Sequence, residues 1–482
     1  MAISNSHHAA LLSSPGMGHI IPILELAKSL VTHHIIPKVT LFLASIKSTV
    51  PSKAETHVLQ SAIKENLFEI IQLPPLDITK SLGSDATIET RIGLIMHEIP
   101  PLFLSTISNM KLNPTILITD FFLSQVIPLA KNLKVPMYAF APTNAWLLAL
   151  GLYTPTLDKE VQGQYNEPIS IPGCKSIHPS DLFEMLLDRT HPLYHEYLGT
   201  CEGVTQADGI LVNTFNELEP KTLAALSSGQ ITKVPVYPIG PLIRETNQNN
   251  DEEKRSDVLD WLDKQEEESV IYVSFGSAYT MSQEQIKEMA LGLELSGKKF
   301  VWSLRSSSAI KPGNEHYLTA GESIETPSVS KLEESSSFPE EFYRIQNNVF
   351  VIIDWAPQLD ILKHSSIGGF VSHCGWNSVI ESVSCGVPMV AWPLYAEQKM
   401  NAAMLAEEVG IAVRIEVQLS NTNMVRKEDI VKAIRKIMDK DDKEGCAVRK
   451  RVKELKHIAE EAWSHDGSSY FALSRISLSN GE

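Results

Sequence analysis

Short apolar runs alternate with longer amphipathic stretches through most of this 482-residue chain, and this alternation constrains its fold more than any other feature. In the first half the pattern predicts one helix at 20–33 and strands at 9–14, 38–45, 114–120 and 135–144. In the second half it predicts strands at 269–277, 298–305, 348–358, 367–371 and 387–393. Strands that alternate with helices are typical of parallel sheets covered by helices. The sequence therefore predicts an α/β protein.

The alternation is interrupted once, in the middle of the chain. "PVYPIGPLI" is rich in proline and is followed by the polar stretch "RETNQNNDEEKRSD", a combination typical of an interdomain linker. A chain of this length is also too long for one ordinary hydrophobic core. We therefore expect a first domain at 1–245, a linker at 246–268 and a second doubly wound domain at 269–460. The Ser- and Glu-rich segment 306–337 is expected to form a long mobile loop.

Composition excludes several classes of function. The formal net charge is −16, and the basic run 449–457 has the spacing of a solvated helix face, so a nucleic-acid partner is not expected. Five scattered cysteines indicate free thiols in a reducing compartment. The N-terminus lacks the features of a signal peptide, and no apolar run is long enough to insert into a membrane. We expect a cytoplasmic protein.

Polar side chains follow four predicted strands of the second domain, at the point where each strand ends. They are Ser277, the pair Trp355 and Gln358, the group from His373 to Ser378, and the pair Glu397 and Gln398. Ligands of open parallel sheets bind beyond the carboxyl ends of the strands. The four groups therefore predict a single pocket.

The stretch "HCGWNSVIES" (373–382) joins a predicted strand to a predicted helix. A helix that begins near Asn377 presents unpaired backbone N–H groups that bind anions. Asn377 and Ser378 can cap this helix and donate to a phosphate, and His373 can donate another hydrogen bond. Glu381, about one turn further, can accept from a ribose diol. Trp355 offers a flat face for a base.

Other nucleotide-binding and catalytic sequence motifs are absent or incomplete. "GMGHII" lacks the third glycine of the dinucleotide fingerprint, and neither a phosphate-binding P-loop nor a G-x-S-x-G elbow is present. The acidic triplet "DKD" (439–441) lies at a charged helix end and is interpreted as solvated surface. We therefore expect no metal and no bound cofactor.

The stretch from Trp355 to Gln398 closely resembles the signature of the plant secondary-product glycosyltransferases, which use UDP-sugars. It opens with "WAPQ", contains "HCGWNS" and closes with "EQ". "SSPGMGHIIP" and "VSFGS" extend the resemblance over nearly the whole chain, and "GLYTPTLD" is similar to the branch that glucosylates hydroquinones, monolignols and stilbenes. The resemblance implies two facing Rossmann-like domains of the GT-B type. It also implies a C-terminal helix, at 461–482, that crosses back onto the first domain, and a monomer.

The resemblance also implies roles for individual residues. Trp355 would stack on uracil, with Ala356 and Gln358 at the base edge, and Glu381 would hold the ribose hydroxyls. The diphosphate would be held by Ser277, His373, Asn377 and Ser378. The sugar would face Trp376, Glu397 and Gln398, where the closing Gln implies UDP-glucose. Many members have Asp in place of Glu397, but the carboxylate is kept. Thr143 would contact the sugar or the acceptor.

The catalytic groups are expected in the first domain. His19 opens a helix after a Gly-rich loop, where the helix dipole disfavours the imidazolium and keeps a neutral base available. Asp120 ends a strand of the same sheet and can fix the tautomer of His19. "DFFLS", with Phe121 and Phe122, and "NAWLLALGLY" supply apolar walls suited to a small phenolic acceptor. The predicted activity is an inverting, metal-independent O-glucosyl transfer. The alternatives are a nicotinamide-dependent oxidoreductase and a non-catalytic protein that binds nucleotide-sugars.

Overall fold

The computed structural model divides the chain into two compact units. It describes residues 7–46, 53–77, 88–161, 167–191, 193–244, 256–276, 281–304, 348–353, 356–415 and 424–478. The described residues up to 243 form the first unit together with those from 459 onward, and the described residues of 244–458 form the second. The expected mobile loop at 306–337 lies outside the described residues.

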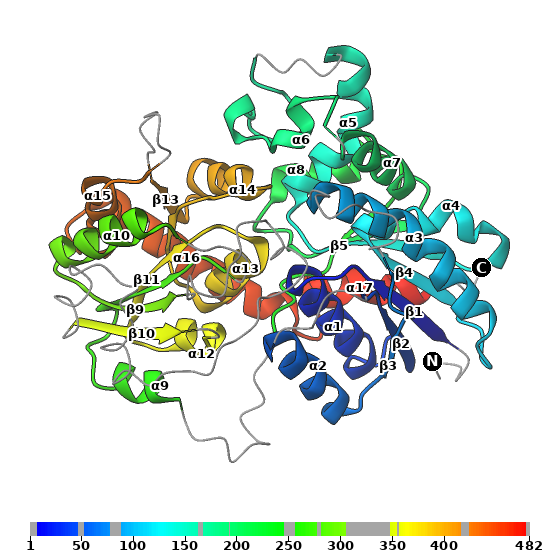
Figure 1. Ribbon diagram of the computed structural model, residues 1–482, viewed down its shortest axis with the longest axis horizontal. Helices are drawn as coiled ribbons and strands as arrows, with labels where there is room; N and C mark the ends of the chain where they lie inside the picture. Colours follow the sequence, from blue (N-terminus) through cyan, green and yellow to red (C-terminus); the bar gives the residue numbers. More distant parts are fainter. Residues whose placement is uncertain are drawn as a thin grey trace. The chain divides into compact units, whose positions relative to one another are not determined.

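Each unit is built on one parallel sheet (Figure 1). The first sheet has the order β3-β2-β1-β4-β5-β6-β7 and the second the order β10-β9-β8-β11-β12-β13. The strands of the first are β1 (His8–Ser13), β2 (Lys38–Leu43), β3 (Glu69–Gln72), β4 (Ile116–Asp120), β5 (Met137–Ala141), β6 (Gly209–Val212) and β7 (Val236–Pro238). Those of the second are β8 (Val270–Ser274), β9 (Lys299–Leu304), β10 (Val349–Ile353), β11 (Ile367–Ser372), β12 (Met389–Ala391) and β13 (Ala412–Arg414). In both sheets the strand order reverses once, between β1 and β4 and between β8 and β11, and ligands of such folds bind at this point.

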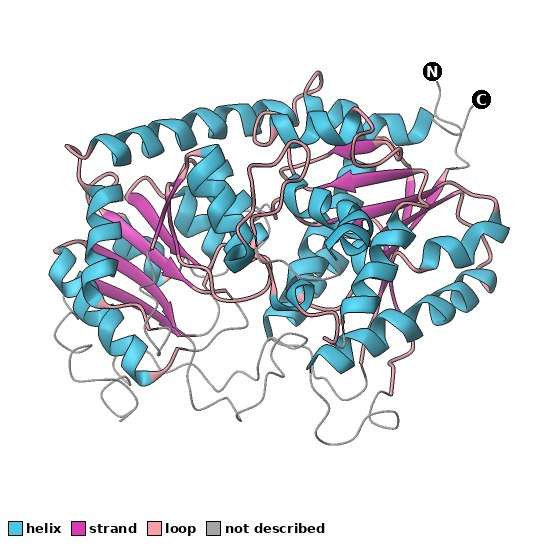
Figure 2. Ribbon diagram, turned by 90° about the horizontal axis from the view of Figure 1, so that it is seen from above, coloured by secondary structure: helices cyan, strands magenta, loops and turns pink. Residues whose placement is uncertain are grey.

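Helices lie on both faces of each sheet (Figure 2). The first unit contains α1 (Met17–Thr32), α2 (Lys53–Glu65), α3 (Ile88–Ser108), α4 (Val126–Ala130), α5 (Ala145–Val161), α6 (Glu184–Leu187), α7 (Tyr194–Val204), α8 (Pro220–Ser227) and α17 (Ser468–Leu478). The second contains α9 (Asp257–Leu262), α10 (Gln283–Ser296), α12 (Gln358–Lys363), α13 (Trp376–Cys385), α14 (Gln398–Met404) and α15 (Lys427–Met438), and α16 (Lys443–Ala462) ends in the first. Among the described residues, no helix has the length and apolar character needed to cross a membrane.

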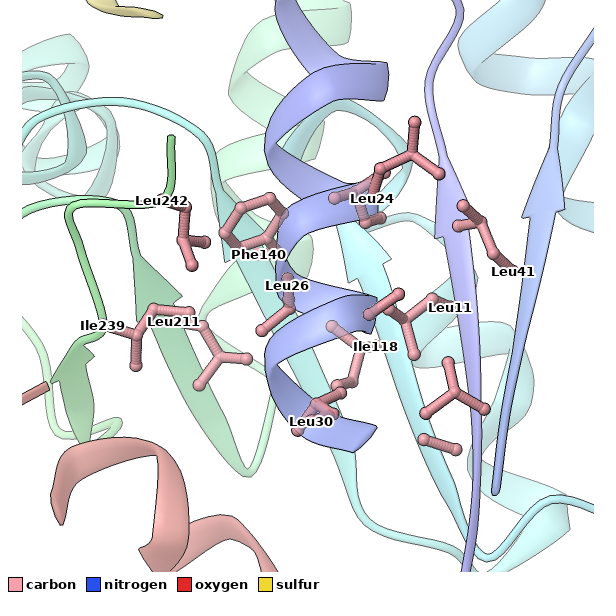
Figure 3. Close-up of a cluster of buried hydrophobic side chains, with 14 of the residues drawn as sticks. Leu11, Leu24, Leu26, Leu30, Leu41, Ile118, Phe140, Leu211, Ile239 and Leu242 are labelled. Atoms are coloured by element: carbon pink, nitrogen blue, oxygen red, sulfur yellow. The ribbon is translucent and has the colours of Figure 1, made fainter. Parts of the chain in front are cut away.

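Helix α1 is fixed to the first sheet by its apolar face. Leu24, Leu26 and Leu30 pack against strand residues that include Leu11 and Ile118 (Figure 3). The other side chains of these strands, such as Leu12 and Leu117, are buried too, as expected for strands covered on both faces. This packing sets the position of the first turn of α1, which carries His19.

The second unit has a comparable core. Helices α10 and α15 pack together on its sheet through side chains such as Met289, Leu293 and Ile434. Ser282 caps the start of α10 by accepting from the Gln285 N–H at 3.2 Å, and Gly297 ends the helix in the left-handed region at φ 69°. A glycine adopts this conformation without strain.

Part of the predicted linker is structured. Residues 257–262 form α9, which buries Val258 and Leu262 and places Trp261 5.9 Å from the Phe350 ring of β10. Polar residues surround this short helix, so the sequence pattern predicts a linker over the whole of 246–268. At the other end of the chain, α17 packs on β7 of the first unit.

Candidate active site

One candidate site, in the first unit, is formed by His19 and Asp120, at the point where the strand order of the first sheet reverses. Asp120 is the last residue of β4, and His19 is the third residue of α1, which follows the neighbouring strand β1. Gly16 makes the turn between β1 and α1 with φ 101°, a conformation that favours glycine. The Nδ1 atom of His19 lies 2.8 Å from Oδ2 of Asp120. The structure thus brings together the two residues that the sequence analysis paired.

Asp120 is held by further donors. Its side chain has no solvent exposure, and its Oδ1 accepts from the Ser14 hydroxyl at 2.6 Å and from the Phe122 N–H at 3.1 Å. These donors replace the hydrogen bonds to water that a buried carboxylate loses. Since the carboxylate accepts at Oδ2, it selects the His19 tautomer that carries its proton on Nδ1 and leaves Nε2 as the basic nitrogen. Ser14 was not singled out from the sequence, although it stands directly before the Gly-rich loop.

Aromatic rings surround this pair. The Phe122 ring lies 5.1 Å from the His19 ring, and the Phe121 ring lies 5.8 Å from Phe122 and 6.3 Å from Tyr197. Phe121 is buried and Phe122 half-buried. The environment next to the imidazole is therefore apolar and aromatic, as suits an aromatic ligand.

Thr143 lies in the loop between β5 and α5. Asp120 and Phe140 are paired in the register of β4 and β5, so this loop leaves the sheet at the edge where Asp120 ends β4. The Thr143 Oγ1 atom is buried and has no hydrogen-bond partner among the described residues. A buried hydroxyl in this state costs about 1–3 kcal/mol unless a ligand supplies the partner.

A second candidate site, in the second unit, is centred on Gln358 at the start of α12. Its Nε2 donates to the Ser378 hydroxyl at 3.0 Å and to Oε2 of Glu381 at 2.7 Å, and its Oε1 accepts from the buried Tyr272 hydroxyl at 3.4 Å. Ser378 and Glu381 lie on successive turns of α13. Gln358 therefore fixes two of the residues predicted to contact the donor.

Glu381 has an unusual acidity. Burial raises its pKa to about 7, although the Gln358 amide and the charges of Arg244 and Lys363 favour the ionised form. At neutral pH the carboxyl is therefore divided between its two protonation states. The ionised form has two acceptor oxygens, whereas protonation turns one of them into a donor and reduces the capacity to accept from hydroxyl groups.

His373 follows β11, beside β8, at the strand-order reversal of the second sheet. A Cβ atom added to Gly276 or Gly375 would lie 2.6 or 2.5 Å from its Nε2 atom, so the ring fits only between glycines. Burial lowers the pKa of His373 to about 4, and its buried Nδ1 has no hydrogen-bond partner among the described residues. A neutral imidazole that lacks a protein partner can bond to a ligand.

The start of α13 differs from the prediction. The helix begins at Trp376, with Gly375 as its N-cap and no capping side chain, whereas a start near Asn377 with Asn377 and Ser378 as caps was expected. Gly375 takes the N-cap position because His373 fills the space that a side chain there would need. The first turn of α13 therefore has no side-chain cap from its N-cap residue. Asn401, which sequence reasoning missed, fixes the preceding turn through an Nδ2 bond to the Cys374 carbonyl at 2.9 Å.

The remaining predicted residues are placed as follows. Gln398 begins α14, and its Oε1 accepts from the Leu394 and Tyr395 N–H groups at 3.0 and 3.2 Å, with Glu397 just before it. Its Oε1 is thus engaged, and Nε2 is the atom able to donate to a sugar. Ala356 and Trp376 are buried, whereas Ser277 and Trp355 lie outside the described residues.

Comparison with known proteins assigns the family. Residues 233–453 match the family described as UDP-glucoronosyl and UDP-glucosyl transferase. Anthocyanidin 3-O-glucosyltransferase 5 from Manihot esculenta is 44% identical over 482 residues, covering 98% of this chain and 95% of the relative. UDP-glycosyltransferase 72D1 from Arabidopsis thaliana is 41% identical and covers 97% of each chain.

Solved structures agree with this assignment. Phytolacca americana UGT2, complexed with UDP-2fluoro-glucose and pterostilbene, is 33% identical with a TM-score of 0.83, covering 99% of this chain and 100% of the other. TcCGT1 in complex with UDP is 41% identical with a TM-score of 0.84, covering 98% of this chain and 99% of the other. The predicted GT-B fold, with two Rossmann-like units and a C-terminal helix that returns to the first, is confirmed. The chain belongs to the UDP-glucoronosyl and UDP-glucosyl transferase family, among the plant enzymes that glycosylate small molecules with UDP-sugars.

Proposed function

We propose that this enzyme transfers glucose from UDP-glucose to a hydroxyl group of a small phenolic acceptor, with inversion at the anomeric carbon. The observation that carries the proposal is the 2.8 Å contact between Nδ1 of His19 and a fully buried Asp120. In this arrangement His19 is a positioned base and Asp120 stabilises its protonated form.

The reaction follows from these roles. The Nε2 atom of His19 takes the proton of the acceptor hydroxyl while its oxygen forms a bond to the anomeric carbon. The bond from that carbon to the diphosphate breaks, and UDP leaves with the electron pair. His19 then releases its proton to solvent. A free phenol has a pKa of about 10, so a base increases the reactive fraction at neutral pH.

The second unit is proposed to bind the donor. Glu381 and Gln358 would hold the ribose and the base edge, Trp355 would stack on uracil, and His373 and the N-terminal amides of α13 would hold the diphosphate with Ser277, Asn377 and Ser378. The sugar would contact Trp376, Glu397 and the Nε2 atom of Gln398. Glucose is supported by this Gln398 donor and by the relative named as an anthocyanidin 3-O-glucosyltransferase.

The acceptor is proposed to lie against the first unit. The rings of Phe121 and Phe122 beside His19 support a flat phenolic molecule, such as a hydroquinone, monolignol, stilbene or flavonoid. A solved relative that holds pterostilbene agrees with this class.

We further propose that the reaction needs no metal ion and that the protein is a cytoplasmic monomer. The α13 amides and His373 would supply the positive ends that a cation supplies elsewhere. Activity should therefore survive EDTA. Activity that EDTA abolishes and a divalent ion restores would contradict this proposal, and light scattering tests the monomer.

The base assignment is tested with a series of phenols of decreasing pKa, measuring UDP release from UDP-glucose. His19→Ala should lower kcat by about 10²–10⁴-fold for weakly acidic phenols. The loss should shrink as the acceptor pKa falls, because acidic phenols need less help. A loss of equal size across the series would contradict proton abstraction by His19. If the unaltered protein itself released no UDP with any phenol, a non-catalytic binding protein would be favoured.

A further inference from the structure

The first turn of α5 has its backbone amides satisfied by side chains. The Ala145 N–H donates to Oε2 of Glu219 at 2.9 Å, and the Trp146 N–H donates to Oε1 of the same carboxylate at 3.0 Å. The Leu147 N–H donates to Oδ1 of Asn144 at 2.6 Å. Asn144 is the ordinary local cap, but Glu219 comes from another part of the fold.

Glu219 is a buried carboxylate with a fixed geometry. Its residue is 4% exposed, and Oε2 also accepts from the Thr214 hydroxyl at 2.6 Å. Thr214 and Glu219 lie between β6 and α8, and Glu219 is 74 residues beyond Ala145, the first residue of the helix that it holds. The carboxylate therefore ties the end of one strand to the helix that follows the neighbouring strand.

The segment held in this way contains Thr143. Three residues separate the last residue of β5 from the first residue of α5, and Thr143 is the middle one. On one side β5 is fixed in the sheet beside β4, which ends in Asp120. On the other side α5 is fixed by Glu219. The buried Thr143 Oγ1 has no hydrogen-bond partner in the part of the chain that the structure describes, so a ligand hydroxyl is a suitable partner.

We infer that Glu219 is a positioning residue for the transfer reaction, because it holds the Thr143 hydroxyl in place to bond a substrate hydroxyl near the His19–Asp120 pair. The inference rests on the proposed glucosyl transfer. Glu219 itself is buried behind the helix start and does not contact the substrate. Its effect on the rate passes through Thr143.

A purely structural helix cap would give a different result, and the chain offers a control. Oδ2 of Asp208 accepts from the Met137 N–H at 2.8 Å, at the opposite end of β5. Asp208→Asn changes the same kind of contact, between a carboxylate and a backbone amide, away from Thr143. It should keep kcat/KM within about twofold of the unaltered enzyme.

The test is a double-mutant cycle of Glu219→Gln and Thr143→Val, read as kcat and KM for UDP-glucose and a phenol. Each single variant should lower kcat/KM by about 10- to 100-fold, because misplacing a contact by about 1 Å has effects of this size. The double variant should be no worse than the poorer single one, and the Kd of UDP should not change. Losses that multiply, or a Glu219→Gln loss no larger than that of Asp208→Asn, would overturn the inference.

Thr214→Val keeps the test informative if Glu219→Gln does not fold. It removes one hydroxyl donor to Glu219 and leaves the carboxylate and its helix amides in place. By itself, Thr214→Val should lower kcat/KM less than Glu219→Gln does. Combined with Thr143→Val, it should cause no further loss of kcat/KM beyond that of Thr143→Val. A further loss in the double variant would count against a positioning role. Absence of any glucosyl transfer by the unaltered protein would instead overturn the proposed function and this inference with it.

Discussion

At the scale of single residues, Glu381 is the group whose charge changes near neutral pH. Burial raises its pKa to about 7, so the ionised fraction increases as the pH rises through neutrality. Since the carboxylate is the better acceptor for the ribose hydroxyls, the Kd of UDP-glucose should increase as the pH falls from about 8 to 6. Calorimetric titration without acceptor measures this directly, because UDP-glucose itself does not titrate in this range.

The matched variant is Glu381→Gln, which keeps the shape of the side chain and removes its titration. It should bind UDP-glucose weakly and with little dependence on pH over the same range. His373 cannot mimic the effect, because its pKa of about 4 lies below the range. A Glu381→Gln protein whose affinity follows the same pH curve as the unaltered protein would exclude Glu381 as the titrating group.

Gln398 gives a second prediction about a single residue. Gln398→Glu keeps oxygen atoms that can accept from the Leu394 and Tyr395 N–H groups and removes the Nε2 donor. We expect kcat/KM for UDP-glucose to fall about 10-fold, the effect of one lost hydrogen bond to a ligand, with little change in the Kd of UDP. Enzyme kinetics and UDP titration measure the two values. A parallel loss in both would show that Gln398 acts on the nucleotide or the loop instead of the sugar.

Some side-chain contacts of the candidate sites can be predicted from the sequence, and others cannot. The pairing of His19 with Asp120 could be predicted because both follow strands, and strand ends of a parallel sheet meet at one edge. The bond from Ser14 to Asp120 could not be predicted, since a serine before a Pro-Gly pair is common in ordinary turns. The start of α13 was misplaced by one residue because side-chain caps are more common than glycine, and only the structure shows that His373 excludes a side chain at Gly375.

At the scale of elements, the predicted strands lie within a few residues of those observed, because runs such as 367–371 are apolar on both faces. Short helices were harder to predict. α9 has one turn, and Val258 and Leu262 are its only fully buried side chains among many charged neighbours. Hydrophobic periodicity needs several turns to be recognised.

The packing of α17 on the first unit leads to a prediction about stability. Leu473 is fully buried in the core that contains α1, whereas Phe471, on the same helix, is 63% exposed. Leu473→Ala should lower the free energy of unfolding by about 2–5 kcal/mol, and Phe471→Ala by about 0.5 kcal/mol or less. Urea and thermal unfolding measure both. If Leu473→Ala lowered the free energy of unfolding as little as Phe471→Ala does, α17 would contribute little to the stability of the first unit.

At the scale of the whole molecule, each unit has its own sheet, its own core and its own group of polar residues at the strand-order reversal. The sequence predicted this division from one change in composition near residue 235. The first unit carries His19 and Asp120, and the second carries Gln358, Ser378 and Glu381. These two sets of residues belong to different compact units. We therefore expect binding of the nucleotide and proton transfer to be separable by mutation.

The prediction is a comparison of three variants. His19→Ala should leave the Kd of UDP within about twofold and reduce kcat, since it removes a contact made only in the transition state. Gln358→Ala should raise the Kd of UDP and the KM of UDP-glucose, because it releases both Ser378 and Glu381. The double variant should bind UDP as Gln358→Ala does and lose kcat as His19→Ala does, because the two substitutions are expected to act on separate steps and so to contribute independently. Calorimetry gives the Kd and steady-state kinetics give kcat. If His19→Ala weakened UDP binding as much as Gln358→Ala does, the nucleotide would depend on the first unit, and the assignment of donor and base to separate units would fail.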